Sequence, residues 1–324
     1  MTRPQLAIVV DTEEEFDWTK PFARENRATS SIPAQALIHE VYDPLGMVPT
    51  YVIDHPVATD PRAVDFLTGL QRTGRAEIGT HLHPWVSPPH EEEVTRRNSY
   101  HCNLPAALER AKIVTLTETI ESAFGRRPTV FKAGRYGFGK NTATVLAELG
   151  YAIDCSYVPW MNFAEDGGPD YRNTPDQPFW LDDAQKLLEV PLTSGFFGLL
   201  AHAGPKFQRV LNSPRAGRLR VPGLLARSGL LARSRLSPEG VSAAEQCRLL
   251  DAMVGSGRRF FTLTYHSPSL APGHTPYVQS GADLRDFVAR IEQVLLHFRD
   301  VLGGEFTTLT RYRDSLIATR AAAA

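Results

Sequence analysis

Short apolar segments alternate with amphipathic segments along most of the chain. Runs rich in β-branched and aromatic residues predict strands at residues 6–10, 48–54, 76–81, 128–133, 151–156, 187–192, 260–266 and 306–309. Between these runs apolar residues recur at helical spacing, and residues such as Ser31 and Gly46 mark the start and end of a predicted helix. This alternation is typical of βαβ units, so we expect a parallel sheet.

No repeat, low-complexity segment or long linker divides residues 1–324, and we therefore expect a single domain. Seven or eight strands that mostly alternate with helices predict a closed or nearly closed β/α barrel. Residues 203–238 interrupt the alternation with Lys and Arg residues among leucines and Pro–Gly breaks. We predict a basic helical insertion there, and we expect it to be a solvated face or a subunit contact rather than a membrane-surface or anionic-ligand site.

The first predicted strand, Leu6 to Val10, ends in a dense group of acids. Five carboxylates fall within seven residues, at Asp11, Glu13, Glu14, Glu15 and Asp17. Such a group at the mouth of a buried strand is costly, because like charges repel each other and burial removes their water. A bound cation is the simplest compensation, and a solvated acidic loop is the alternative.

Other polar residues follow the ends of later predicted strands. They are His81 and His83, Arg135, Asp154 and His266. The carboxyl ends of the strands of a parallel barrel share one face, so we expect these side chains to gather around Asp11 and Glu13.

One carboxylate and two imidazoles form a ligand set that suits zinc or a similar divalent ion. We predict that His81 and His83 bind the metal together with a carboxylate from the end of the first strand, since residues two apart in a strand point to the same side. His90 is a further candidate. His266 is either a general acid across the mouth of the barrel or a strand-end histidine bonded to a backbone carbonyl.

Composition narrows the function classes further. The 324 residues are 42% hydrophobic and 22% charged with a formal net charge of −1, so no overall field favours nucleic acid or an anionic membrane. Three distant cysteines argue against a disulfide framework or a CxxC zinc site. No apolar run is long enough for a transmembrane helix, and no signal-peptide pattern precedes the first strand, so we expect a cytoplasmic protein.

Several of these segments resemble motifs of the polysaccharide deacetylase (NodB-homology) family, carbohydrate esterase family 4. The segment EIGTH at 77–81 resembles the family's approach to its metal histidines, and 46–53 resembles its second strand. The family's histidines stand four apart; Trp85 stands four after His81 here, so His83 is expected in that role. The resemblance implies a distorted (β/α)7-type barrel in a divergent variant of the family.

The resemblance also implies a function. The protein would be a metal-dependent hydrolase that removes N- or O-linked acetyl groups from a carbohydrate or related small substrate, a deacetylase for amide bonds other than peptide bonds. Zn²⁺, or else Co²⁺, Ni²⁺ or Mn²⁺, on Glu13, His81 and His83 would polarise the acetyl carbonyl and lower the pKa of a water molecule.

The remaining roles are implied in the same way. Asp11 would accept a proton as water attacks, and His266 would protonate the leaving amine or hydroxyl. The family's arginine is matched by Lys132 or Arg135; we expect Arg135 to orient Asp11. Asp154, which resembles an acid of the family's fourth motif, would hold His266.

Two other functions remain open from the sequence. One is a glycosidase that uses Asp11 or Glu13 with Asp154 and needs no metal. The other is a degenerate deacetylase that binds a glycan or a partner without hydrolysis. For a cytoplasmic protein, a nucleotide sugar, a lipid-linked sugar or a small acetylated amine would be a more accessible substrate than a polysaccharide.

Overall fold

The computed structural model describes residues 2–182, 184–211 and 221–323. Eleven strands are present in these residues. They are β1 (Gln5–Thr12), β2 (Thr50–Ile53), β3 (Glu77–Leu82), β4 (Val130–Ala133), β5 (Ile153–Asp154), β6 (Phe179–Trp180), β7 (Leu188–Glu189), β8 (Ser194–Phe197), β9 (Ala232–Arg235), β10 (Phe260–His266) and β11 (Glu305–Phe306).

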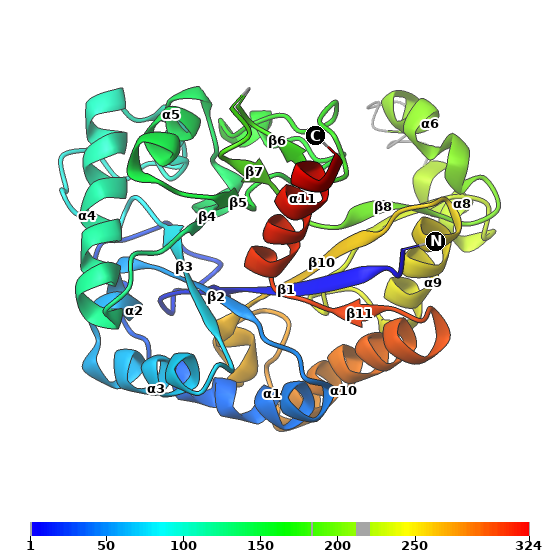
Figure 1. Cartoon of the computed structure of the whole chain (residues 1–324), viewed down its shortest axis with the longest axis horizontal. Coiled ribbons are helices and arrows are strands. Elements are labelled where there is room, and N and C mark those ends of the chain that lie inside the picture. Colours follow the sequence, from blue (N-terminus) through cyan, green and yellow to red (C-terminus); the bar gives the residue numbers. More distant parts are fainter. Residues whose placement is uncertain (1, 183, 212–220, 324) are drawn as a thin grey trace.

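Most of the strands form one curled sheet. Its order is β10-β1-β2-β3-β4-β5-β7-β6, with β11 also paired to β1. All neighbours are parallel except β6 and β7. The predicted fold class, a distorted β/α barrel, is therefore confirmed, although among the described residues the sheet stays open between β10 and β6 (Figure 1).

Two irregular segments cover the open edge of β10. The Thr193 N–H donates to the Thr262 carbonyl oxygen (3.4 Å), and the Thr264 N–H donates to the Leu236 carbonyl oxygen (3.2 Å). The Leu236 N–H in turn donates to the Thr193 carbonyl oxygen (2.8 Å). These bonds satisfy backbone groups that a barrel strand would otherwise satisfy.

Most of the helices cover the outside of the curled sheet, with α1, α3 and α10 along one side and α4 and α5 at one end (Figure 1). Their bounds are α1 (Gln35–Tyr42), α2 (His55–Thr59), α3 (Pro61–Arg72), α4 (Ala106–Phe124), α5 (Lys140–Leu149), α6 (Gly204–Leu211), α8 (Val221–Arg227), α9 (Ala243–Gly255), α10 (Gly281–Leu296) and α11 (Leu309–Ala323). The predicted strand at 306–309 is shorter than expected, because Leu309 already begins α11.

The two faces of β1 pack into different parts of the core. Leu6, Ile8 and Val10 point outward into the cluster that the surrounding helices share. Ala7 and Val9 point inward, where their cluster also contains Leu309, Tyr312 and Leu316 of α11. Strand residues alternate between faces, so this inner side continues to positions 11 and 13 as β1 ends.

The predicted helical insertion at 203–238 is only partly helical. It begins with α6 and contains α8, whereas β9 returns as a strand that pairs antiparallel with β8. Part of the expected basic segment, residues 212–220, lies outside the described residues.

Candidate active site

The inner face of the sheet gathers the candidate residues at the carboxyl ends of the strands. Asp11 and Glu13 continue the inward positions of β1, while His81 and His83 do the same for β3. His266 ends β10, which lies directly beside β1. All five side chains line one cavity of about 700 Å³, a size that suits a small ligand.

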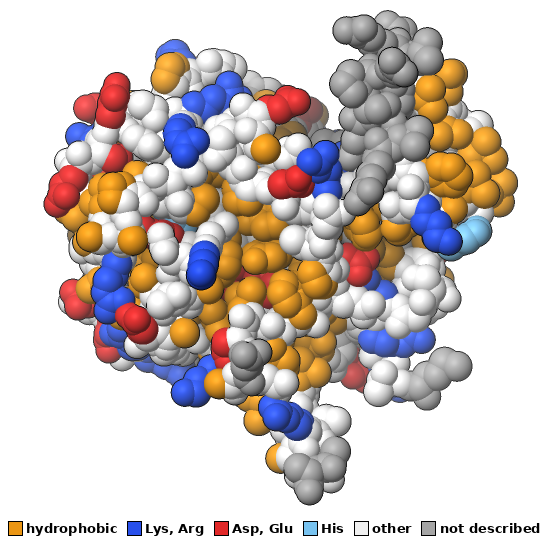
Figure 2. Space-filling view, turned by 90° about the horizontal axis from the view of Figure 1, so that it is seen from above, with side chains coloured by type: hydrophobic (Ala, Val, Ile, Leu, Met, Phe, Trp, Pro, Cys, Tyr) orange, Lys and Arg blue, Asp and Glu red, His pale blue; other side chains and the backbone are white. Residues whose placement is uncertain are grey.

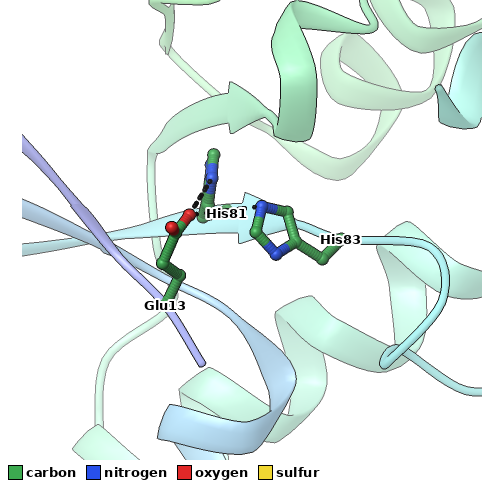
Figure 3. Close-up of side chains that lie close together, drawn as sticks. All are labelled: Glu13, His81 and His83. Carbon is green, nitrogen blue, oxygen red and sulfur yellow. Dashed lines mark ion pairs between the residues drawn. The ribbon is translucent and has the colours of Figure 1, made fainter. Parts of the chain in front are cut away.

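Glu13, His81 and His83 converge on one point at the base of this cavity. The Glu13 Oε2 atom lies 3.5 Å from His81 Nε2 and 3.4 Å from His83 Nε2. Figure 3 shows the carboxylate facing both rings, with dashed lines that mark the two ion pairs. One ligand atom from each residue lies within 4.8 Å of the others, so the three can hold one metal ion.

Hydrogen bonds on the far side of each ring fix this orientation. His81 Nδ1 lies 3.1 Å from the Lys132 carbonyl oxygen and therefore carries the proton, because a carbonyl only accepts. His83 Nδ1 lies 2.8 Å from Glu14 Oε2. Each Nε2 is thus left free to bind a metal, which is the usual support of a metal-binding histidine.

Trp85 supports His83 rather than replacing it. Its indole Nε1 donates to Glu14 Oε1 (2.7 Å), and its ring stacks on the His83 ring with centroids 4.3 Å apart. Trp85 therefore helps to hold the His83 ring in place. Among the described residues, His90 does not line the cavity.

The donor set fits a metal cation. Glu13 Oε1 is buried and has no hydrogen-bond partner among the described residues. Burial, together with nearby Glu14 and Asp11, raises the pKa of Glu13 well above its usual value, although His266 opposes this. Burial lowers the pKa of His81 and brings that of His83 to about 4, so both rings are neutral, as metal binding requires.

Glu14, Asp54 and His83 form a second possible group of ligands. Glu14 already accepts bonds from Trp85 and His83, and its backbone N–H donates to Asp54 Oδ2 (2.8 Å). These bonds make Glu14 a support for His83, so the Glu13 group is the better candidate for a metal site.

Asp11 is held by a buried lysine. Lys132 Nζ lies 2.5 and 2.7 Å from its two carboxylate oxygens, and Nζ also donates to Thr264 Oγ1 (3.1 Å). Burial alone would raise the pKa of Asp11, but the charges of Lys132 and His266 lower it below its usual value. Asp11 is therefore ionised and can accept a proton.

Arg135 does not orient Asp11, and the expectation is corrected in favour of Lys132. Arg135 follows β4 in a left-handed conformation (φ 52°), so its side chain leaves the inward direction that Lys132 keeps. Its guanidinium lies over the Tyr100 ring at 4.2 Å and pairs with Asp166 at 3.3 Å. Arg135 still lines the cavity, but as part of its wall.

His266 is paired with a residue that the sequence did not indicate. Its Nδ1 lies 2.8 Å from Glu239 Oε2, and its backbone N–H donates to Glu239 Oε1 (2.9 Å). His266 Nε2 faces Asp11 Oδ2 at 3.7 Å. Burial would lower the pKa of His266, but the charges of Glu239 and Glu13 raise it to about 9, so the ring is cationic at neutral pH.

Asp154 does not hold His266, and this expectation is also corrected. Ile153 and Cys155 occupy the inner face of β5, so Asp154 points to the opposite face. There it accepts bonds from the Ser156 hydroxyl (2.7 Å) and the Ser156 N–H (3.1 Å). Burial raises its pKa and that of neighbouring Glu189.

Replacing Glu239 with glutamine should remove the charge that keeps His266 protonated. In the metal-free protein we expect the pKa of His266 to fall from about 9 to its ordinary 6.5 or below, since burial then dominates. A pH titration of the His266 ring by NMR measures this change. The raised pKa stabilises the folded protein below about pH 6.5, and this contribution is lost as pH rises through about 9.

The matched control is Glu292→Gln, an exposed position on α10. It should leave the titration unchanged. A His266 pKa still near 9 in Glu239→Gln would show that another group supplies the charge.

Gly134 makes room for the metal group. A Cβ at this position would lie 2.4 Å from His83 Cδ2 and 2.4 Å from the Leu82 carbonyl oxygen. Gly134→Ala should therefore displace His83, lower metal affinity by about 10–100-fold and destabilise the fold by about 1–3 kcal/mol. Metal titration and thermal unfolding measure both effects.

Gly69→Ala on α3 is the control, because nothing lies within 4 Å of its added Cβ. It should leave metal affinity unchanged and add up to about 1 kcal/mol of helix stability. Equal metal affinity in both alanine variants would contradict the role assigned to Gly134.

Aromatic rings build the cavity wall around these groups. Trp18 packs edge-on against His266 and Tyr277, with centroids 5.0 and 5.8 Å away. Tyr136 and Phe163 stack 5.3 Å apart. Such flat apolar walls with a few converging polar groups are typical of ligand pockets.

No family model matches the sequence, and no curated protein sequence matches it. Solved structures do match. The chain is 18% identical to a Mycobacterium smegmatis protein classed as a polysaccharide deacetylase (TM-score 0.53), covering 98% of this chain and 91% of that one. It is 14% identical to PuuE allantoinase (TM-score 0.55), and this match covers 97% of this chain and 90% of the allantoinase chain.

A third match is a GH57 branching enzyme from Thermococcus kodakaraensis. It is 14% identical with a TM-score of 0.52, and the match covers 97% of this chain and 71% of that one. The three proteins differ in chemistry, so the likeness establishes the architecture and leaves the reaction to the residues of the site. The resemblance to polysaccharide deacetylases is thereby confirmed in the fold, and the chain has the polysaccharide deacetylase (NodB-homology) fold.

Proposed function

We propose that the protein is a metal-dependent hydrolase that removes acetyl groups from a carbohydrate or a related small substrate. The observation that carries this proposal is the convergence in one cavity of a possible metal group, an ionised carboxylate and a cationic imidazole. Glu13, His81 and His83 would hold the metal, and zinc suits this donor set. When bound, the metal would polarise the acetyl carbonyl and make water more acidic.

Asp11 is suited to act as the general base. Lys132 holds both of its oxygens and keeps it ionised, so Asp11 can accept a proton from the attacking water. Lys132 thereby performs the positioning role expected of Arg135.

His266 is suited to act as the general acid on the other side of the cavity. Glu239 holds Nδ1, so the protonated Nε2 points toward the reacting centre and can donate to the leaving amine or hydroxyl. The base and the acid thus hold opposite protonation states at the start of the reaction, as the two proton transfers require.

The cavity wall favours an acetylated sugar. Sugar rings have apolar faces that pack against aromatic side chains, and Trp18, Tyr136 and Phe163 provide such surfaces. A cavity of about 700 Å³ accommodates one or two sugar units of an amide- or ester-linked substrate.

The glycosidase alternative loses its expected residue pair, because Asp154 points away from the cavity that contains Asp11 and Glu13. A binding protein without hydrolysis is the second candidate. Its support is the change in histidine spacing, which leaves Trp85 where the family has a ligand.

Acetate release separates the two functions. Zinc-loaded protein is incubated with N-acetylated and O-acetylated mono- and disaccharides, nucleotide sugars and small acetylated amines. The hydrolase predicts acetate release that a chelator abolishes and zinc restores. Sugar binding by calorimetry without any acetate release would support the binding protein and overturn the hydrolase.

A further inference from the structure

The hairpin β8–β9 has a large tip, which we define as residues 198–211 and 221–231. The base of the hairpin lines the cavity through Leu192, Thr193, Arg235 and Leu236. The tip begins only four strand residues further on, about 13 Å along an extended chain. The tip is therefore attached directly to one wall of the candidate site.

Charge is distributed very unevenly around this tip. Residues 190–238 contain eight Lys and Arg residues and no Asp or Glu, so all 36 acidic residues of the chain lie elsewhere. The complete chain has a formal net charge of only −1. Lys206 of α6 and Arg227 of α8 are exposed. A basic, acid-free segment in a nearly neutral chain is expected to attract an anionic partner.

Large hydrophobic side chains are exposed on the same tip. The exposed fractions are 77% for Leu199, 39% for Leu200, 49% for Phe207 and 60% for Leu224. In the rest of the described chain, only Val301 and Ile317 are large hydrophobics with comparable exposure. Figure 2 shows hydrophobic side chains gathered at the upper right of the view, beside basic side chains and a histidine.

Backbone hydrogen bonds join the two ends of the tip. The Leu199 N–H donates to the Gly229 carbonyl oxygen (3.2 Å), and the Leu200 N–H donates to the Leu230 carbonyl oxygen (2.8 Å). The leucines before α6 are therefore held beside the residues that follow α8. Exposing these leucines in fixed positions costs free energy in water, which suggests that another surface covers them.

We propose that the hairpin tip binds the surface of a membrane that contains anionic lipids. Leu199, Phe207 and Leu224 would enter the boundary between headgroups and acyl chains. The Lys and Arg residues would lie among the lipid phosphates, where the negative surface potential attracts them. No helix in the described ranges is long and apolar enough to cross a bilayer, so the tip lies on the membrane rather than through it.

The exposure of the leucines is what the sequence could not reveal. Charge alone is compatible with a solvated face. Protruding leucine and phenylalanine side chains beside cations match a lipid surface better, because the apolar side chains suit the acyl region and the cations suit the anionic headgroups. The proposal is independent of the reaction at the cavity, and it holds equally for a hydrolase and for a binding protein.

Sedimentation with lipid vesicles tests the proposal on the full chain. Vesicles of phosphatidylcholine with phosphatidylglycerol should pull down the protein at low salt, whereas pure phosphatidylcholine vesicles and high salt should not. The double variant Lys206→Glu/Arg227→Glu should reduce the partition coefficient on the order of 20-fold or more. Leu199→Ser/Leu224→Ser should reduce it on the order of tenfold.

Two controls match these variants. Arg62→Glu/Arg72→Glu makes the same charge change on exposed positions of α3, and Val301→Ser/Ile317→Ser removes exposed hydrophobics elsewhere. Both should bind vesicles as the wild type does. Absence of binding to anionic vesicles, or equal losses in the tip and control variants, would overturn the proposal.

Sedimentation velocity tests whether a second copy of the chain, rather than a membrane, covers the hairpin tip. A wild-type dimer that becomes monomeric in Leu199→Ser/Leu224→Ser, with no vesicle binding, would show that a second copy of the chain covers the tip and would also overturn the proposal.

Discussion

Asp11→Asn is expected to lower kcat/KM for acetyl release by about 10²–10⁴-fold, the usual contribution of a general base. An amide cannot accept the proton of the attacking water, whereas the Asp11 carboxylate is ionised beside Lys132. Acetate release from the substrate found in the screen measures the effect, with Asp65→Asn on exposed α3 as the unchanged control.

The same substitution should also lower stability. It leaves the Lys132 ammonium buried without a carboxylate, which typically costs about 3–5 kcal/mol. The double variant Asp11→Asn/Lys132→Gln removes both charges and should regain part of that loss, as measured by denaturant unfolding. A folded and inactive double variant supports the role of Asp11 in the reaction; a folded variant with wild-type activity contradicts it.

Metal content should depend on both predicted histidine ligands. We expect about one equivalent of zinc or a related metal in the wild type and less than about one tenth in His81→Ala and in His83→Ala, since each substitution removes one of the three proposed protein ligands. Elemental analysis of the purified proteins measures this directly. His297→Ala, at a surface pair with Asp251, should keep its metal.

The individual histidine variants lead to different conclusions. If only His81→Ala loses its metal, His83 is excluded as a ligand and His90 becomes the next candidate. No metal in the wild type, even after reconstitution, would exclude the proposed mechanism and leave the binding protein.

Strand periodicity explains which parts of the site the sequence could predict. Asp11 lies within β1 and His81 within β3, and Glu13 and His83 each follow two residues later, so alternation alone placed each pair on one face of its strand. The same rule selects Lys132 over Arg135, because Lys132 lies within β4 and Val130 shares its face. Arg135 comes after the strand, where a left-handed residue ends the alternation.

Other features had no usable local signal. Alternation in 151–156 places Asp154 opposite Ile153, but only the packed core shows which of the two faces is inside. Glu239 lies in the loop after β9 and reaches His266, the last residue of β10, across 27 residues of sequence. Such pairings depend on tertiary packing, which periodicity does not encode.

The buried Glu13 Oε1, for which the described part of the chain offers no hydrogen-bond partner, also affects how the protein can be handled. A buried carboxylate oxygen without a partner lowers the free energy of unfolding of the metal-free protein. A cation that binds only the folded state raises this free energy again. A bound ion at one hundred times its dissociation constant adds about 2.7 kcal/mol to the free energy of unfolding. A simple melting curve, recorded with and without chelator, would therefore report how much of a preparation is loaded before any substrate has been identified.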